Sequence, residues 1–266
     1  GWWNNSEPAC AVDVHPETTP QSTGAAALTS TPPPQATPQN TGAVASTSTP
    51  AQQTFNPPCR GLPEPGFDRE PHRRTALEEL RCGIAISQNL PVAQRQQELV
   101  ELSHQHRVVL MDAATGSGKS TLVPLFLAAK CLENGKDCRM VVTQPRRMAA
   151  KELAKHVAKN CGTNVGDLIG YRIGGARVDN KAMITYVTVG HFLEALVHSP
   201  AHVEKFSHIV LDEVHERFVA ADFMMALLRL LLSRRETAHI RVVVMSATMQ
   251  KALSDFFRPL LFPCPA

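Results

Sequence analysis

The feature that most constrains this fold is a series of short aliphatic runs in which apolar residues do not alternate with polar ones. A strand of this kind is apolar on both faces, so it is expected to be covered on both sides, as in a parallel sheet. Stretches with apolar residues at helical spacing separate the runs. This order predicts βαβ units and therefore an α/β domain, with a mainly parallel sheet flanked by helices. The aliphatic runs are residues 107–111, 140–142, 183–187, 209–211 and 242–245.

The helical stretches lie between these runs, and two of them have clear end signals. Asparagine and glycine follow the stretches that end near residues 132 and 159, as expected where a helix stops. The predicted helices are residues 75–86, 92–104, 121–132, 148–159 and 223–233.

Residues 1–70 have a different composition from the rest of the chain. They hold twelve of the 20 prolines, and residues 18–59 contain no charged residue and consist mostly of Thr, Ser, Pro, Gln and Ala. Such a segment buries too little apolar surface to offset the entropy of ordering its backbone. We therefore predict that residues 1–70 are disordered. The pair Trp2 and Trp3 is a candidate anchor for a protein partner, although a chance aromatic pair in a tail is the simpler interpretation.

The net charge and the length of the most apolar stretch limit the classes of protein that this sequence fits. The net charge of +3 over 266 residues is too small to indicate a nucleic-acid or membrane partner by itself. Residues 1–70 hold two arginines against six acidic residues, so the basic charge lies in the remainder. The most apolar stretch, residues 223–232, is about ten residues long and is interrupted by Arg229. It therefore fits a buried helix better than a membrane span.

The cysteines and the absence of a secretory signal indicate the compartment, and the first residue indicates how the chain arises. Seven cysteines without a C-x-x-C pair argue against a paired zinc motif or a disulfide framework, and they favour reduced thiols. No secretory signal is visible, so we expect an intracellular protein, in the nucleus or the cytoplasm. The chain begins with Gly1 rather than Met, which suggests a processed product or a fragment.

A phosphate-binding pattern follows the run at residues 107–111. Residues 113–121 read AATGSGKST and lead into a predicted helix. Small residues let backbone N–H groups point inward around a triphosphate, and the helix dipole favours the anion. In such a loop Lys119 reaches the β- and γ-phosphates and Ser120 offers its hydroxyl to Mg²⁺. Ala113 stands where the pattern usually has glycine, which adopts unusual backbone conformations more easily.

Acidic residues follow the run at residues 209–211, where the chain reads DEVHER. Ligands bind outside the carboxyl ends of the strands in sheets of this kind. We predict that Asp212 contributes to the Mg²⁺ shell and that Glu213 orients and deprotonates an attacking water.

Two further strand ends carry polar side chains. Ser246 and Thr248 follow the run at residues 242–245, where their hydroxyl groups would lie beside the site and sense the loss of the γ-phosphate. Arg146 and Arg147 follow the run at residues 140–142 and suit contacts to a nucleic-acid backbone. Two arginines alone would equally fit a solvated helix start.

Together and in this order, AATGSGKST, TQPRRMAA, TVGHFLEAL, LDEVHER and MSATM resemble the first RecA-like domain of superfamily 2 helicases of the DEAH/RHA group. The resemblance covers about residues 75–266 and implies that they form a RecA-like P-loop NTPase domain that binds ATP. It also implies ATP-dependent translocation on RNA, or unwinding of RNA, in the 3′-to-5′ direction.

The resemblance implies a role for each matching position, with ATP and Mg²⁺ as cofactors and RNA as a partner held through its backbone. His215 would couple the site to a partner domain. The implied catalytic residues are Lys119, Asp212, Glu213 and His215. The implied ATP-binding residues are Thr115, Gly116, Ser117, Gly118, Lys119, Ser120 and Thr121. Ser120 and Asp212 would hold Mg²⁺, partly through water, and Ser246 and Thr248 would couple hydrolysis to movement. The implied RNA contacts are Arg146, Arg147, Thr188 and Gly190.

The family's second RecA-like domain, which carries its arginine fingers, has no counterpart before Ala266. We therefore expect these 266 residues alone to bind ATP–Mg²⁺ but to hydrolyse it weakly. Two alternatives remain open at this point: a non-catalytic module that binds a nucleotide or a partner, and a P-loop DNA translocase.

Overall fold

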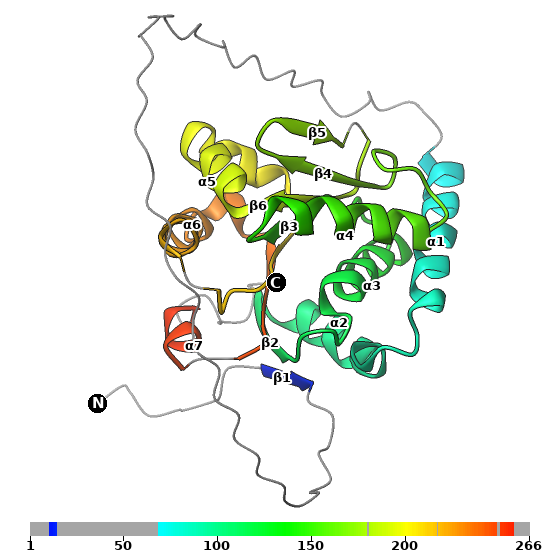
Figure 1. The fold of residues 1–266 in the computed structure, drawn as a ribbon, viewed down its shortest axis with the longest axis horizontal. Helices are drawn as coiled ribbons and strands as arrows, with labels where there is room; N and C mark the ends of the chain where they lie inside the picture. The colour runs from blue at the N-terminus through cyan, green and yellow to red at the C-terminus, as the bar shows by residue number, and fades with distance from the viewer. Residues whose placement is uncertain (1–10, 15–68, 180, 217, 249–250, 258–266) are drawn as a thin grey trace, which may run out of the picture. The chain divides into compact units, whose positions relative to one another are not determined.

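The computed structural model describes residues 11–14, 69–179, 181–216, 218–248 and 251–257. They form one sheet of eight strands in the order β1-β2-β8-β7-β3-β6-β4-β5 (Figure 1). Neighbouring strands are parallel except β4 and β5, so the predicted α/β architecture is confirmed. The strands are β1 (Ala11–Val14), β2 (Val108–Ala113), β3 (Met140–Gln144), β4 (Ile169–Ile173), β5 (Ala176–Val178), β6 (Ile184–Thr188), β7 (His208–Leu211) and β8 (Arg241–Ser246).

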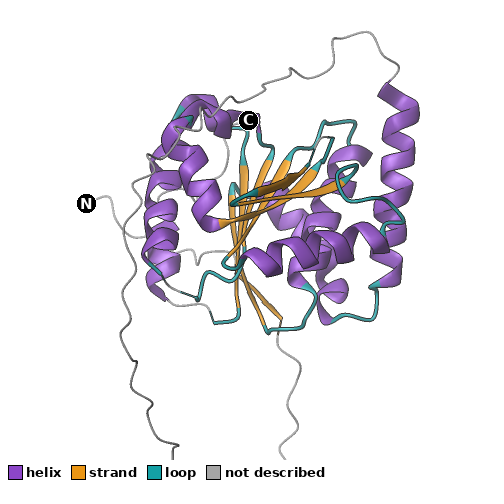
Figure 2. Cartoon of the chain, turned by 45° about the horizontal axis from the view of Figure 1, so that its top comes forward, coloured by secondary structure: helices purple, strands orange, loops and turns teal. Residues whose placement is uncertain are grey.

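Helices lie on both faces of this sheet (Figure 2). None of the helices in the described part of the chain is long and apolar enough to cross a membrane. The α-helices are α1 (Arg69–Ile86), α2 (Gln96–Gln105), α3 (Lys119–Glu133), α4 (Arg147–Asn160), α5 (Val189–His198), α6 (Val219–Leu232) and α7 (Lys251–Phe257). The 3-10 helices are η1 (Pro91–Arg95), η2 (Pro200–Lys205) and η3 (Arg235–Thr237).

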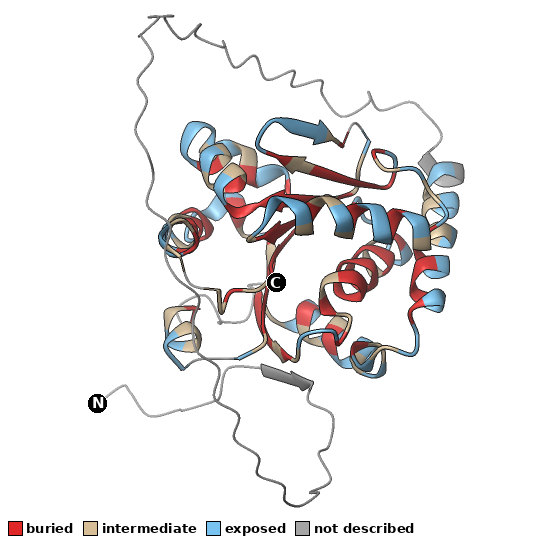
Figure 3. Cartoon of the chain, viewed as in Figure 1, coloured by how far each residue is buried: buried red, intermediate tan, exposed pale blue. Residues whose placement is uncertain are grey.

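The pleat of the strands divides the apolar core into two layers. Val109 and Met111 of β2 join the layer that includes residues of α1 to α4. Val108 and Leu110 of the same strand join the layer formed with α5 and α6. Figure 3 shows the inner strands buried and the outer sides of α1 and α4 exposed. Both faces of these strands are therefore apolar, which explains why apolar residues do not alternate with polar ones in the aliphatic runs.

The elements differ from the prediction in a few places. The segment predicted as one helix from residue 92 is divided into η1 and α2, because Pro91 opens a 3-10 turn and Arg95 leaves the helical conformation. Helix α1 begins at Arg69 rather than at residue 75. The short strands β4 and β5 and helix α5 were not predicted as elements. Gly170 and Arg172 interrupt the apolar pattern of β4, which hides it from a periodicity argument.

Four residues of the segment predicted to be disordered form a strand. Ala11–Val14 pairs in parallel with β2, with Ala11 beside Leu110 and Val14 beside Ala113. The free edge of β2 supplies hydrogen-bonding groups that composition alone does not reveal, so the prediction of disorder fails at these four residues. The rest of residues 1–68, including Trp2 and Trp3, lies outside the described residues.

Candidate active site

The strand order brings the predicted functional segments to one edge of the sheet. β2, β8, β7 and β3 are parallel neighbours, so the segments that follow them open on the same side. The phosphate-loop sequence follows β2, the acidic sequence follows β7, and Ser246 ends β8. The carboxyl edge therefore brings together residues as distant in the chain as Ala113 and Ser246.

The loop between β2 and α3 is shaped by close packing from the preceding segment. Gly118 has φ of 90°, and a Cβ there would lie 2.7 Å from Leu90 Cδ1. The Val92 N–H donates to the Ser117 carbonyl oxygen at 3.1 Å. Ala113 lies buried in β2, and its φ is not positive, so alanine fits where the pattern has glycine. Leu90 and the first turn of η1 therefore pack against this loop.

The loop also has features that fit a phosphate group. The Ser117 hydroxyl oxygen is buried and has no hydrogen-bond partner among the described residues. Thr115 and Gly116 are exposed, whereas Thr121 is buried in the first turn of α3. Phosphate oxygens are suitable acceptors for a hydroxyl group and for the N–H groups at a helix start. The residues present therefore fit a bound phosphate group, such as one of a nucleotide.

Lys119 and Glu213 form an ion pair across the site. Lys119 Nζ lies 3.0 Å from Glu213 Oε1, and the lysine side chain is only 3% exposed. Glu213 has φ of 55°, the one positive value among the described residues other than glycine. Such a conformation costs about 1–3 kcal/mol and is found mainly at functional sites. The buried ammonium has a carboxylate partner, and the phosphates of a nucleotide would compete for the same cation.

Asp212 is buried beside the start of α3. Its Oδ2 accepts a hydrogen bond from Gln144 Nε2 at 2.6 Å, and its Oδ1 accepts one from the Glu213 N–H at 2.9 Å. Burial raises the pKa of Asp212, while hydrogen bonds from Ser120 and Gln144 partly offset the rise. A hydroxyl and a carboxylate side by side are oxygen ligands that suit Mg²⁺. The structure thus brings the two predicted metal ligands together, and metal binding itself stays a prediction.

Two residues that sequence reasoning did not assign support this geometry. Gln144, at the end of β3, orients Asp212. Tyr186 of β6 donates from its hydroxyl to the Ser120 carbonyl oxygen at 2.8 Å, and burial raises its pKa well above 10. Gln144 carried a weak signal, because it lies in the TQPRR motif, whereas Tyr186 is one aromatic residue in an aliphatic strand.

His215 lies between the acidic turn and the loop after β8. Its Nδ1 lies 3.2 Å from Glu213 Oε2 and 3.3 Å from the Ala247 amide nitrogen, which donates to it. The Ser246 hydroxyl donates to the Thr248 carbonyl oxygen at 2.7 Å, which closes that loop into a turn. The two predicted coupling residues thus belong to a turn that His215 contacts directly.

The predicted RNA-binding residues lie next along the same edge. Arg146 and Arg147 are exposed, and Thr188 pairs in register with the last residue of β3. Gly190 is exposed in the first turn of α5, whereas the Thr188 side chain is buried and offers little surface. Arg146 pairs with Glu216 at 3.1 Å, and Arg147 donates to the Gly174 carbonyl oxygen. These residues share an edge, and their contact with RNA stays a prediction.

Comparison with known proteins agrees with this arrangement. The chain is 40% identical over 161 residues to the ATP-dependent RNA helicase TDRD9 of Danio rerio, and 35% identical over 171 residues to TDRD9 of Homo sapiens. It is 33% identical over 183 residues to the probable ATP-dependent RNA helicase spindle-E of Drosophila melanogaster. These alignments cover 60%, 64% and 68% of this chain but only 12%, 12% and 13% of the relatives, so the chain spans about an eighth of their length.

The profile of one family also matches most of the α/β domain. The match extends over residues 93–256, from η1 to α7, and includes the segments that form the carboxyl edge. The sequence motifs, the strand order and this match lead to one conclusion: the chain belongs to the DEAD/DEAH box helicase family.

Proposed function

We propose that this chain is the ATP-binding domain of a DEAH-type RNA helicase, in which ATP hydrolysis drives movement along RNA or its unwinding. One observation carries the proposal. Lys119 at the start of α3 lies 3.0 Å from Glu213, directly after Asp212, although 93 residues separate the lysine from the aspartate. A phosphate loop and a carboxylate pair that meet at one sheet edge are the elements that phosphoryl transfer requires.

The residues present suggest how the site would work. The N–H groups of the loop and the Ser117 hydroxyl would bind phosphate oxygens, while Lys119 would exchange its bond to Glu213 for one to the phosphates. Ser120 and Asp212 would hold Mg²⁺, and bound ATP–Mg²⁺ supplies the phosphoryl group and the cationic charge beside it. Once Lys119 has moved, Glu213 would be available to orient a water and accept its proton.

RNA is the proposed partner because the similar proteins are named as RNA helicases. The exposed pair Arg146 and Arg147 lies beside the nucleotide site, on the same edge of the sheet. Contacts of this kind bind the backbone without reading the sequence.

The nucleotide part of the proposal is tested by measuring the binding of a fluorescent ATP analogue with Mg²⁺ to the 266-residue chain. Lys119→Ala is expected to weaken binding by at least about tenfold, because it removes a charge-assisted bond to the phosphates. Lys130→Ala is the matched control, since Lys130 lies on the same helix but is 41% exposed. It is expected to bind like the unaltered chain. Equal affinity of the Lys119→Ala variant, with its circular dichroism unchanged, would contradict the proposal.

A further inference from the structure

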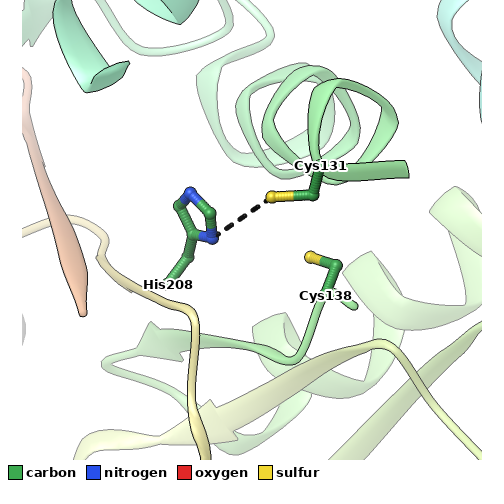
Figure 4. A group of neighbouring side chains, drawn as sticks. All are labelled: Cys131, Cys138 and His208. Carbon is green, nitrogen blue, oxygen red and sulfur yellow. Dashed lines mark hydrogen bonds between the residues drawn. The ribbon is translucent and has the colours of Figure 1, made fainter. Parts of the chain in front are cut away.

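Three side chains with metal-binding chemistry meet outside the nucleotide site. Cys131 lies near the end of α3, Cys138 lies in the loop before β3, and His208 is the first residue of β7. Their two Sγ atoms and a His208 ring nitrogen lie within 4.8 Å of one another. Figure 4 shows the three side chains converging from these three segments, with a dashed line between Cys131 and His208. Cys131 Sγ lies 3.9 Å from His208 Nδ1.

We propose that Cys131, Cys138 and His208 bind a Zn²⁺ ion through two sulfur atoms and one imidazole nitrogen. Tetrahedral Zn²⁺ with bonds of about 2.3 Å to sulfur and about 2.1 Å to nitrogen places a sulfur and a nitrogen ligand about 3.6 Å apart and two sulfur ligands about 3.8 Å apart. The 3.9 Å between Cys131 and His208 is within a few tenths of an ångström of this, and all three ligand atoms lie within 4.8 Å of one another. Two sulfur ligands and one nitrogen ligand also favour zinc over magnesium or calcium, which prefer oxygen.

The surroundings of the cluster suit a small ion. Cys138 and His208 are 9% and 8% exposed, whereas Cys131 is less buried and leaves a route from the solvent. The Ser207 hydroxyl lies 3.0 Å from His208 Nδ1 and is also placed to donate to the Arg139 carbonyl oxygen at 3.1 Å. Ser207 can therefore leave the ring nitrogen available to an ion, and a water can fill the fourth position.

The protonation of the pair is consistent with this site. Hydrogen bonds from Cys138 and His208 outweigh the effect of burial and lower the pKa of Cys131 to about 5. The hydrogen bond with Cys131, together with burial, raises the pKa of Cys138 well above 9. Zinc binds thiolates, so binding here would release the thiol protons that remain on the pair.

The position of the cluster gives it a structural role. It lies at the amino ends of β3 and β7, whereas the nucleotide site lies at their carboxyl ends. The same α3 begins at Lys119, and the same β7 ends just before Asp212. An ion here would join the far ends of the two elements that carry the phosphate loop and the acidic pair. This inference does not depend on the proposed function.

The experiment measures zinc in the 266-residue chain after it is reduced, incubated with ZnCl₂ and desalted. Elemental analysis is expected to find about one equivalent of zinc. Loading with Co²⁺ is expected to give the intense visible bands of a tetrahedral site and a thiolate charge-transfer band in the near ultraviolet. Cys131→Ser and Cys138→Ser are each expected to lower the retained zinc by at least about tenfold. Cys82→Ser, which alters an exposed thiol on α1, is expected to retain it.

A second measurement needs no variant and so avoids any loss of folding. Zinc is expected to slow the alkylation of Cys131 by iodoacetamide by about tenfold or more, while the exposed Cys82 reacts at an unchanged rate. Retention of zinc by a folded Cys131→Ser variant at the level of the unaltered chain would overturn the proposal. The proposal would also be overturned if the reduced chain retained no zinc. This holds equally if Cys131 and Cys138 form a disulfide when the reductant is left out.

Discussion

At the scale of single residues, Glu213 shows how the site stores backbone strain. Its φ of 55° is unfavourable for a side chain, yet its N–H bonds to Asp212 Oδ1 and its carboxylate pairs with Lys119 and lies beside His215. These contacts hold the carboxylate between the phosphate loop and the loop after β8. The proposed role of Glu213, to orient a water, would benefit from such a fixed position.

Asp212 leads to a prediction about pH. Burial raises its pKa above 3.8 in the folded state, so its contribution to stability is present below pH 3.8 and is lost as the pH rises through the raised value. Asp212→Asn removes this loss, although its single amide oxygen can replace only one of the two carboxylate acceptors that Gln144 and the Glu213 N–H use. The stability of the variant relative to the unaltered chain is therefore expected to rise with pH above pH 3.8, as measured by urea unfolding at several pH values.

The control for this experiment is Glu101→Gln, on the exposed face of α2. This variant is expected to follow the pH dependence of the unaltered chain. Parallel stability curves for Asp212→Asn and the unaltered chain across this range would show that burial does not penalise the Asp212 carboxylate.

At the scale of elements, the β4–β5 hairpin depends on a close backbone approach. A Cβ on Gly170 would lie 2.5 Å from the Val178 carbonyl oxygen and 2.7 Å from Asp179 Cα. The Asp179 carboxylate is buried and pairs with Arg172 and Arg177. The glycine and the ion pairs therefore hold the end of the sheet together, which gives a physical reason for the GYRI sequence at residues 170–173.

The hairpin provides a test. Gly170→Ala is expected to lower the free energy of unfolding by about 3 kcal/mol, because backbone atoms must move to admit the methyl group. The amides of β4 and β5 are expected to lose protection from hydrogen exchange. Gly174→Ala is the matched control, since a Cβ there would meet no atom within 4 Å. Equal stability of the two variants would show that the hairpin tolerates a wider separation between Gly170 and the backbone of Val178 and Asp179.

At the scale of the α/β domain, the sheet separates two kinds of chemistry. Its carboxyl edge carries the proposed nucleotide site and the exposed Arg146 and Arg147, and its amino edge carries the Cys131, Cys138 and His208 cluster. Oxygen ligands and cationic side chains lie at the carboxyl edge, whereas thiol and imidazole groups lie at the amino edge. If both proposals hold, metal ions with different ligand preferences would bind at the two edges.

The proposed RNA contacts are tested by the combined variant Arg146→Ala, Arg147→Ala. Binding of a single-stranded RNA is expected to weaken by about tenfold, with a shallower dependence on salt, because fewer phosphates are neutralised. Arg81→Ala is the control, because Arg81 is exposed on α1 and pairs with Glu133. It is expected to bind RNA like the unaltered chain. Unchanged RNA affinity of the combined variant would remove these arginines from the interface, and stronger binding of DNA than RNA would favour the DNA translocase.

The sequence by itself determined the α/β class, the five central strands and the phosphate loop. These features depend on patterns within short segments: apolar residues on both strand faces, helical spacing, and small residues before a lysine at a helix start. The prediction that Ser120 and Asp212 lie close together followed because the segments after parallel strands share an edge of the sheet.

Only the tertiary structure decided which distant side chains meet. Gln144 reaches Asp212, Tyr186 reaches the Ser120 carbonyl oxygen, and Cys131 and Cys138 meet His208, although no spacing in the sequence links these residues. β1 likewise owes its order to the edge of β2 rather than to its own composition. Local patterns record the backbone and burial preferences of each segment, whereas contacts between segments depend on strand order and register, which arise only when the whole sheet assembles.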